Sequence, residues 1–157
     1  QPRIDRGGHR RRTRGLGLTV PTTAQPVYLD ACLLIYLVEE DPVFGDRVAN
    51  ALRARDPRQL AVSPLVRMEV LVKPIRIADL PLQRRYEQAL DALTLLDMPA
   101  EVYDAAAMLR ARFGLRTSDA LHLACAQHHG CQALWTNDGR LARASLGLAR
   151  NILAEPD

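Results

Sequence analysis

Four acidic residues stand where they could do chemistry together: Asp30, Glu69, Asp119 and Asp138. Two of them follow short apolar runs, in VYLD (27–30) and QALWTND (132–138). A third begins the very apolar segment RTSDALHLACA (116–126), and the fourth lies among apolar residues in LVRMEVLVKPI (65–75). Carboxylates that converge repel one another, so proteins bring them together mainly around a cation.

A cluster of these four carboxylates would offer oxygen ligands, and we expect no Cys or His beside them. Oxygen ligands suit Mg²⁺ or Mn²⁺ rather than zinc. Such ions commonly activate a water molecule and offset charge that develops on phosphate oxygens. The pattern therefore favours phosphodiester hydrolysis, with all four acids as catalytic residues and metal ligands.

Two of the acids also have a purely structural explanation at the start of a helix. Thr117 or Ser118 could cap the helix that contains Asp119, whose carboxylate would then simply oppose the positive end of the helix dipole. Asp30 could likewise cap the helix that follows it. Neither alternative is excluded by the local sequence.

The other two acids have local alternatives as well. Glu69 could pair with Lys73 one turn later, although the helical spacing places it on a largely apolar face where an unpaired carboxylate is costly. Asp138 could be a turn residue within Asn137-Asp138-Gly139. Convergence of all four acids at one end of one sheet would be a much larger coincidence than any single alternative.

The elements that must position these acids alternate after residue 26. Short apolar runs, typical of buried strands, occur at 27–30, 60–64, 94–99, 132–138 and 148–152. Helical patterns occupy the intervening segments, one of them ended by Pro74 and another by Gly114. Strands separated by helices pair in parallel, so we predict a three-layer α/β/α sandwich with a parallel sheet of four to five strands. Ligands of such sheets bind at the carboxyl ends of the strands.

Charge divides the chain into two parts. Residues 1–26 contain six arginines and one acid, without apolar periodicity, which predicts a basic, disordered N-terminal arm. The remaining residues, 27–157, contain 15 basic and 17 acidic groups and are predicted to form one domain. Three cysteines without a C-x-x-C pair, and apolar runs too short for a bilayer, favour a reduced, soluble, cytoplasmic protein without membrane association.

Other phosphate-handling folds lack their required residues here. A P-loop needs Gly-Lys-Ser/Thr, but the single lysine of the chain, Lys73, precedes Pro74. Phosphatases that form an aspartyl phosphate need a second acid two residues after the first, where Asp30 is followed by Ala31 and Cys32. A dinucleotide fold needs glycines after the first strand, and none is present.

Histidines and cysteines offer two weaker alternatives. A zinc site could in principle use Cys125, His128, His129 and Cys131, but structural zinc sites normally draw on two separated pairs of ligands. His122, one turn after the third acid, could approach a substrate or metal, or could simply be a packed histidine. The sequence favours packing but leaves both interpretations of His122 open.

Four segments together resemble the PIN-domain ribonucleases, in particular the VapC toxins of bacterial toxin–antitoxin pairs. They are VYLDACLLIYLVE (27–39), SPLVRMEVLV (63–72), TSDALHLACA (117–126) and WTNDGRL (135–141), each with one acid and in the order of the family. The last two are the most specific. Cys32, where Thr or Ser is common, and the basic arm depart from the family pattern.

The resemblance implies a five-stranded parallel sheet and an Mg²⁺- or Mn²⁺-dependent endoribonuclease, a hydrolase. It also implies a homodimer, an RNA substrate and a cognate antitoxin whose C-terminal segment fills the substrate groove. Asp30, Glu69, Asp119 and Asp138 correspond to the family's acids, and Thr136 to a hydroxyl that supports them. A catalytically silent interaction module of this fold and a DNA-directed nuclease of related architecture are the alternatives.

Deletion of residues 1–26 should leave metal-dependent cleavage intact, because every candidate ligand and every predicted element begins at residue 27 or later. If arginines of the arm bind phosphates, their removal should lower the slope of log affinity against log salt by about 0.7 per phosphate for single strands. Single-turnover cleavage by the full chain and by residues 27–157 across a salt series tests this. A folded truncation that cannot cleave saturating RNA would show that the arm belongs to the catalytic unit.

Overall fold

A five-stranded sheet forms the centre of the structure. The computed structural model describes residues 25–154, so nearly all of the predicted arm at 1–26 lies outside the described residues. The strands are β1 (Val27–Leu29), β2 (Leu60–Val62), β3 (Thr94–Leu95), β4 (Ala133–Thr136) and β5 (Ala149–Asn151). All neighbouring pairs are parallel, in the order β3-β2-β1-β4-β5. The predicted parallel sheet is confirmed, with five strands.

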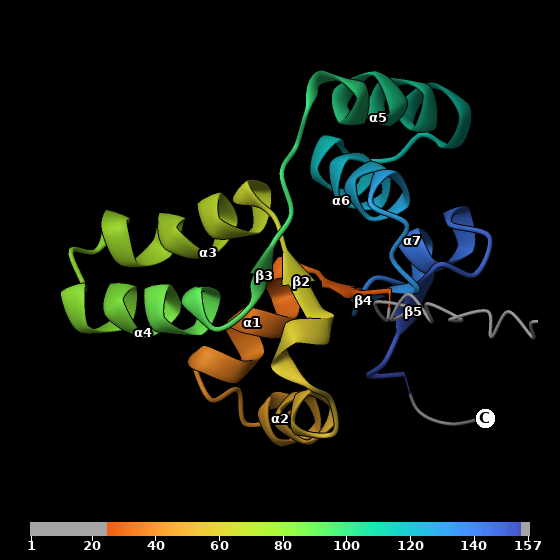
Figure 1. Cartoon of the computed structure of the whole chain (residues 1–157). Helices are drawn as coiled ribbons and strands as arrows, with labels where there is room; N and C mark the ends of the chain where they lie inside the picture. The colour runs from red at the N-terminus through yellow and green to blue at the C-terminus, as the bar shows by residue number, and fades with distance from the viewer. Residues whose placement is uncertain (1–24, 155–157) are drawn as a thin grey trace, which may run out of the picture.

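Helices cover both faces of this sheet. They are α1 (Ala31–Val38), α2 (Gly45–Arg53), α3 (Pro64–Arg76), α4 (Leu80–Asp91), α5 (Ala100–Phe113), α6 (Thr117–His128) and α7 (Gly139–Ala144), with a 3₁₀ turn at Pro57–Gln59. In Figure 1, α5 and α6 lie above the strands, while α1 and α2 lie below them. The predicted three-layer α/β/α sandwich is therefore confirmed.

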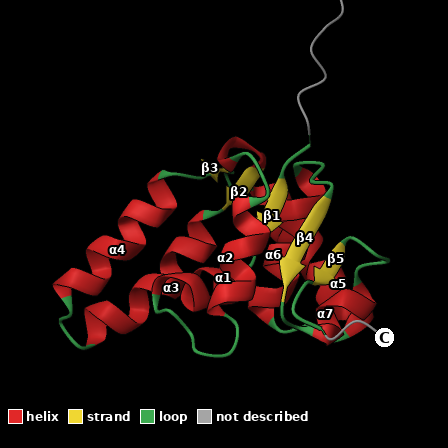
Figure 2. Cartoon of the chain, turned by 90° about the horizontal axis from the view of Figure 1, so that it is seen from below, coloured by secondary structure: helices red, strands yellow, loops and turns green. Residues whose placement is uncertain are grey.

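The core lies along the central strands. Every residue of β1, β2 and β4 is buried, as expected for parallel strands with helices on both faces. The α3–α4 pair packs side by side and extends away from the sheet in both views (Figures 1 and 2). In the described residues, no helix is long and apolar enough to cross a membrane.

The strand order places a crevice between β1 and β4. The chain winds from β1 toward β2 and β3 on one side and from β4 toward β5 on the other, so the winding reverses between the two central strands. Open α/β sheets bind ligands at such a reversal, outside the carboxyl ends of the strands. Asp30 directly follows β1, and Thr136 ends β4 at the same edge.

The predicted end of the third helix at Pro74 is wrong. The α3 helix continues to Arg76, because Pro74 lies in its last turn, where the missing N–H removes only one helical hydrogen bond. The carbonyls of Lys73 and Pro74 accept hydrogen bonds from the amides of Ile77 and Asp79. The predicted stop at Gly114 is confirmed, since its φ of 64° is the left-handed conformation that ends α5.

Candidate active site

Asp30 projects into the crevice instead of capping its helix. It occupies the N-cap position of α1, but its side chain makes no capping hydrogen bond. Instead, Oδ2 of Asp30 accepts a hydrogen bond from Oγ1 of the buried Thr136, at 2.6 Å. The Thr136 oxygen also accepts from the backbone amide of Asp138, at 3.0 Å. The two central strand ends are thus joined through one hydroxyl group.

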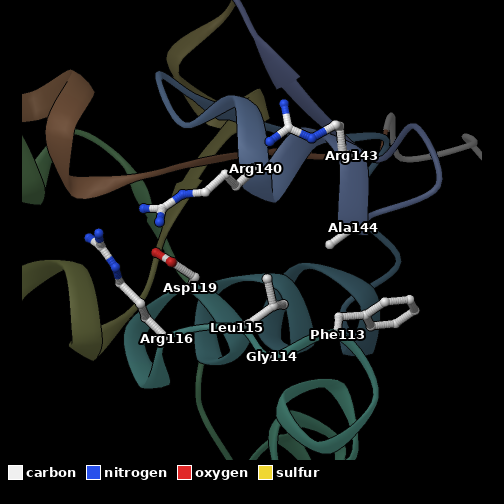
Figure 3. Close-up of a pocket in the computed structure, with 8 residues that line it drawn as sticks. All are labelled: Phe113, Gly114, Leu115, Arg116, Asp119, Arg140, Arg143 and Ala144. Atoms are coloured by element: carbon white, nitrogen blue, oxygen red, sulfur yellow. The ribbon is translucent and has the colours of Figure 1, made fainter.

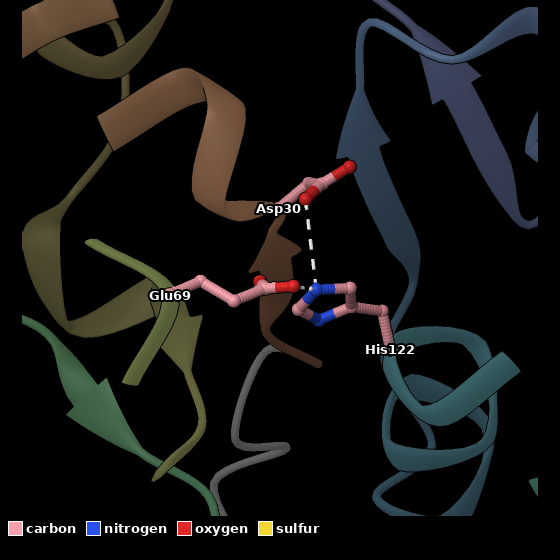
Figure 4. A group of neighbouring side chains, drawn as sticks. All are labelled: Asp30, Glu69 and His122. Carbon is pink, nitrogen blue, oxygen red and sulfur yellow. Dashed lines mark hydrogen bonds and ion pairs between the residues drawn. The ribbon is translucent and has the colours of Figure 1, made fainter. Parts of the chain in front are cut away.

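Glu69 lies opposite Asp30, with a histidine between them (Figure 4). Nε2 of His122 is 2.9 Å from Oε2 of Glu69 and 3.7 Å from Oδ1 of Asp30. The alternative pairing of Glu69 with Lys73 is not formed, because Lys73 pairs with Glu39. The face of α3 that carries Glu69 is also less buried than predicted, and the Glu69 side chain is 25% exposed.

His122 corrects the expectation that no histidine or cysteine would lie beside the acids. It is both packed and part of the site, so the two interpretations left open by the sequence are not exclusive. Its spacing of three residues from Asp119 places both on one face of α6. This spacing was the one indication in the sequence that His122 belongs to the site, and the contact with Glu69 on α3 in the folded protein shows that it does.

A buried chain of hydrogen bonds holds the His122 ring. Nδ1 of His122 is 2.8 Å from the hydroxyl of Tyr28, which is 2.6 Å from Oγ of Ser63. Because Nε2 faces two carboxylates, which can only accept, we assign the neutral ring's proton to Nε2. Nδ1 then accepts from Tyr28, which in turn accepts from Ser63. Burial raises the pKa of Tyr28, so its hydroxyl keeps its proton.

Asp119 reaches the same site from the first turn of α6. The predicted caps of this helix, Thr117 and Ser118, are not at its N-cap position, which is occupied by Arg116 without a side-chain hydrogen bond. Desolvation raises the pKa of Asp119, and the charges of Asp138 and Asp30 raise it further. This carboxylate is therefore held in a partly buried, electronegative position that a cation would relieve.

Asp138 is more distant from the centre of the cluster. Its Oδ1 accepts a hydrogen bond from the backbone amide of Arg140 at 2.7 Å, so it caps α7, in keeping with its local structural alternative. Desolvation alone would raise the pKa of Asp138, but hydrogen bonds from the amide and guanidinium of Arg140 outweigh it and lower the pKa. Asp138 acts on the site through its charge beside Asp119.

A cavity of about 400 Å³ connects these groups. Its lining includes Asp30, Glu69, Asp119 and His122, together with Cys32. Burial, reinforced by the charge of Asp30, raises the pKa of the Cys32 thiol to about 12, so this cysteine lines the cavity as a neutral group. The site thus contains several carboxylates around one open space.

The donor set fits a divalent cation. Side-chain atoms of Asp30, Glu69 and His122 all lie within 4.8 Å of one another, and within residues 25–154 they form the only such group of three or more. With its proton on Nε2, His122 holds the carboxylates, whose oxygens are the preferred ligands of Mg²⁺ and Mn²⁺. Cys125 and Cys131 are buried outside this group.

Comparisons with known proteins agree with this architecture. The family model described as PIN domain matches residues 27–146. Ribonuclease VapC46 from Mycobacterium tuberculosis (strain ATCC 25618 / H37Rv) is 34% identical over 130 residues, which cover 82% of this chain and 96% of the relative.

Solved structures show the same fold at lower identity. A toxin-antitoxin complex from Klebsiella pneumoniae has a TM-score of 0.67 and 24% identity, covering 80% of this chain and 97% of the other. Mycobacterium tuberculosis VapC20, described as a sarcin-ricin loop cleaving toxin, has a TM-score of 0.62 and 16% identity, covering 75% and 94%.

Tyr28→Phe should destabilise the protein by about 1–3 kcal/mol, because it leaves the buried His122 nitrogen and Ser63 hydroxyl without a shared partner. Urea unfolding followed by circular dichroism measures the change. Tyr103→Phe is the matched control, since Tyr103 is 53% exposed on α5. Equal stabilities of the two variants would contradict the assigned hydrogen-bond chain.

Asp119→Asn should stabilise the cation-free protein at neutral pH. Because the folded pKa of Asp119 is raised, the folded state binds its proton more tightly than the unfolded chain does. Stability is therefore lost as pH rises from the ordinary value of 3.8 through the raised folded pKa. The advantage of the Asn variant should shrink on acidification through this window.

Urea unfolding in EDTA across a pH series tests this expectation. Asp104→Asn, on the exposed face of α5, is the control for removal of a carboxylate elsewhere. An Asp119→Asn protein that is less stable than wild type at neutral pH would show that repulsion in the site is not the dominant effect.

Proposed function

The chain belongs to the PIN-domain family, in its VapC-type class, and from this premise we propose that it is a divalent-metal-dependent endoribonuclease and the toxin of a toxin–antitoxin pair. The observation that carries the proposal is the shared cavity of Asp30, Glu69 and Asp119 at the reversal between β1 and β4. Three acids from separate elements around one space are costly to keep without a cation.

We propose Asp30, Glu69, Asp119 and Asp138 as the metal-binding and catalytic acids, with Mg²⁺ or Mn²⁺ as the ion. Bound there, the ion would supply a water molecule of lowered pKa and offset negative charge on the phosphate oxygens. The donor set supports this choice, because all four proposed ligands are carboxylates, and oxygen ligands suit Mg²⁺ and Mn²⁺.

The protein's own contribution is to fix the carboxylates before substrate arrives. Thr136 donates a hydrogen bond to Oδ2 of Asp30. The other oxygen of Asp30, Oδ1, lies 3.7 Å from Nε2 of His122. His122 donates to Glu69 and is itself held by Tyr28. Fixed ligands lose little freedom on binding, which favours both metal affinity and a defined position for the attacking water.

The partners follow from the same proposal. VapC46 is named a ribonuclease, one similar structure is described as a toxin-antitoxin complex and another as a toxin. We propose an RNA substrate, a cognate antitoxin and a homodimer, with residues 27–157 as the nuclease domain and the cytoplasm as its location. An arginine or other cation from the antitoxin would be attracted by the same acids that attract the metal.

Asp30→Asn and Asp119→Asn should each lower RNA cleavage by more than about 100-fold, because even loss of groups that only orient metal ligands costs 10–100-fold. Cleavage of single-stranded RNA by purified wild type and variants in Mn²⁺ measures this, with Asp104→Asn as the control. Near wild-type cleavage by either site variant would rule out the proposed site.

Substrate and metal can be separated in the same assay. The wild type should cut RNA but not the matching DNA in Mg²⁺ or Mn²⁺, and EDTA should abolish cleavage. Preferential cleavage of DNA would favour the related DNA nucleases, and no cleavage of either would favour a silent interaction module. Bound stoichiometric zinc that is lost together with activity would exclude Mg²⁺ and Mn²⁺ as the native ions.

A further inference from the structure

A second cavity, lined by arginines, adjoins the acidic one. It measures about 410 Å³ and lies between the α5–α6 turn and α7, with Arg116, Asp119, Arg140 and Arg143 in its lining. Asp119 lines both cavities and is the boundary between them. The arginine cavity therefore begins where the candidate active site ends.

The three arginines come from two separate parts of the fold but line the same cavity. Arg116 precedes α6, whereas Arg140 and Arg143 lie one turn apart on α7. Figure 3 shows Arg140 extending from α7 toward Asp119 and Arg116 rising beside Asp119, whereas the guanidinium group of Arg143 points away from this carboxylate. The lining contains three positive charges and one carboxylate, which leaves the cavity net positive.

One of these charges is partly offset by an acid outside the cavity lining. Arg140 forms an ion pair with Asp138 at 3.5 Å, whereas within residues 25–154 Arg143 has no acidic partner. All three side chains are exposed, so little hydration must be lost before they bind an anion. Surface arginines usually find carboxylates nearby, and a grouped surplus of them around a cavity indicates an anionic ligand.

A phosphate group fits this cavity better than a free carboxylate does. Guanidinium groups bind phosphate oxygens through paired, charge-assisted hydrogen bonds, and several can share one phosphodiester. The remaining wall is apolar and can contact the ribose or base attached to that phosphate; it consists of Phe113, Gly114, Leu115 and Ala144. A nucleic acid strand offers both groups together.

We propose that Arg116, Arg140 and Arg143 bind a phosphate of the RNA strand adjacent to the phosphate that is cleaved. This inference rests on the proposed ribonuclease function. The acids repel a polyanion, and the body of the chain, residues 27–157, has a net charge of −2. Local binding of a neighbouring phosphate offsets that repulsion and sets the direction in which the strand leaves Asp119.

The first test measures binding of a short single-stranded RNA that the wild type cuts, by fluorescence anisotropy across a salt series. Uncut complexes are obtained in an Asp30→Asn background, to which Arg116→Gln, Arg140→Gln or Arg143→Gln is added. Each added change should weaken binding, and all three together should lower the slope of log affinity against log salt by about 0.7, the contribution of the one phosphate that they share. Arg84→Gln, an exposed arginine on α4, should do neither.

The second test asks whether the arginines act on RNA or on Asp119. In the otherwise wild-type protein, Arg143→Gln should raise the RNA concentration needed for half-maximal single-turnover cleavage and leave the rate at saturation and the Mn²⁺ affinity nearly unchanged. A lower Mn²⁺ affinity or saturating rate with normal RNA binding would overturn the proposal, because the arginine would then act through the acid.

A scan with methylphosphonates locates the phosphate that is bound. One RNA phosphate is neutralised at a time. At one position beside the cleavage site, neutralisation should weaken binding to the Asp30→Asn protein. At the same position it should have no effect on binding to the protein in which all three arginines are also Gln. If no such position exists, or if the three arginine substitutions affect binding no more than Arg84→Gln does, the proposed phosphate site is wrong, although the ribonuclease function would still hold. A wild type that neither binds nor cuts RNA would overturn both, and so distinguishes the two failures.

Discussion

The repulsion between carboxylates at one edge of a buried sheet is the constraint on which the rest of the site depends. Asp30, Glu69 and Asp119 line one cavity, and desolvation together with the neighbouring acids raises the pKa of Asp119. Such a cluster would disperse if its members were free to rotate. It is kept together by buried donors, Thr136 on one side and His122 on the other, whose own positions are fixed by strands and by packing.

The rigid core therefore holds the side chains of the site in the positions that their chemistry needs. Tyr28 and Ser63 belong to the fully buried layer around β1 and β2, yet their hydroxyls extend a hydrogen-bond chain to His122 and from there to Glu69. A close-packed interior gives these groups few alternative rotamers. The parallel sheet adds the second requirement, because it brings the ends of β1 and β4 to the same edge and lets helices deliver acids from either side.

Much of this organisation follows from local sequence patterns. Short apolar runs predict all five strands, and they are clearest for β1, β2 and β4, because a parallel strand covered on both faces must be apolar along its length. Acids that follow such runs, Asp30 and Asp138, are placed at the strand ends by the chain itself. Asp119 is identified by its position at the start of a very apolar helix, and Gly114 by the left-handed turn that only glycine adopts cheaply.

The sequence by itself thus determined the order of the acids along the chain and the edge of the sheet at which they gather. Only the tertiary structure decided their partners: Lys73 pairs with Glu39 and not with Glu69, His122 lies between two acids, and three arginines from separate elements share one cavity. The physical reason is distance along the chain. Strand and helix patterns arise from neighbours a few residues apart, whereas a side chain's partner depends on which elements pack against it, and residues 69 and 122 meet because α3 and α6 are in contact.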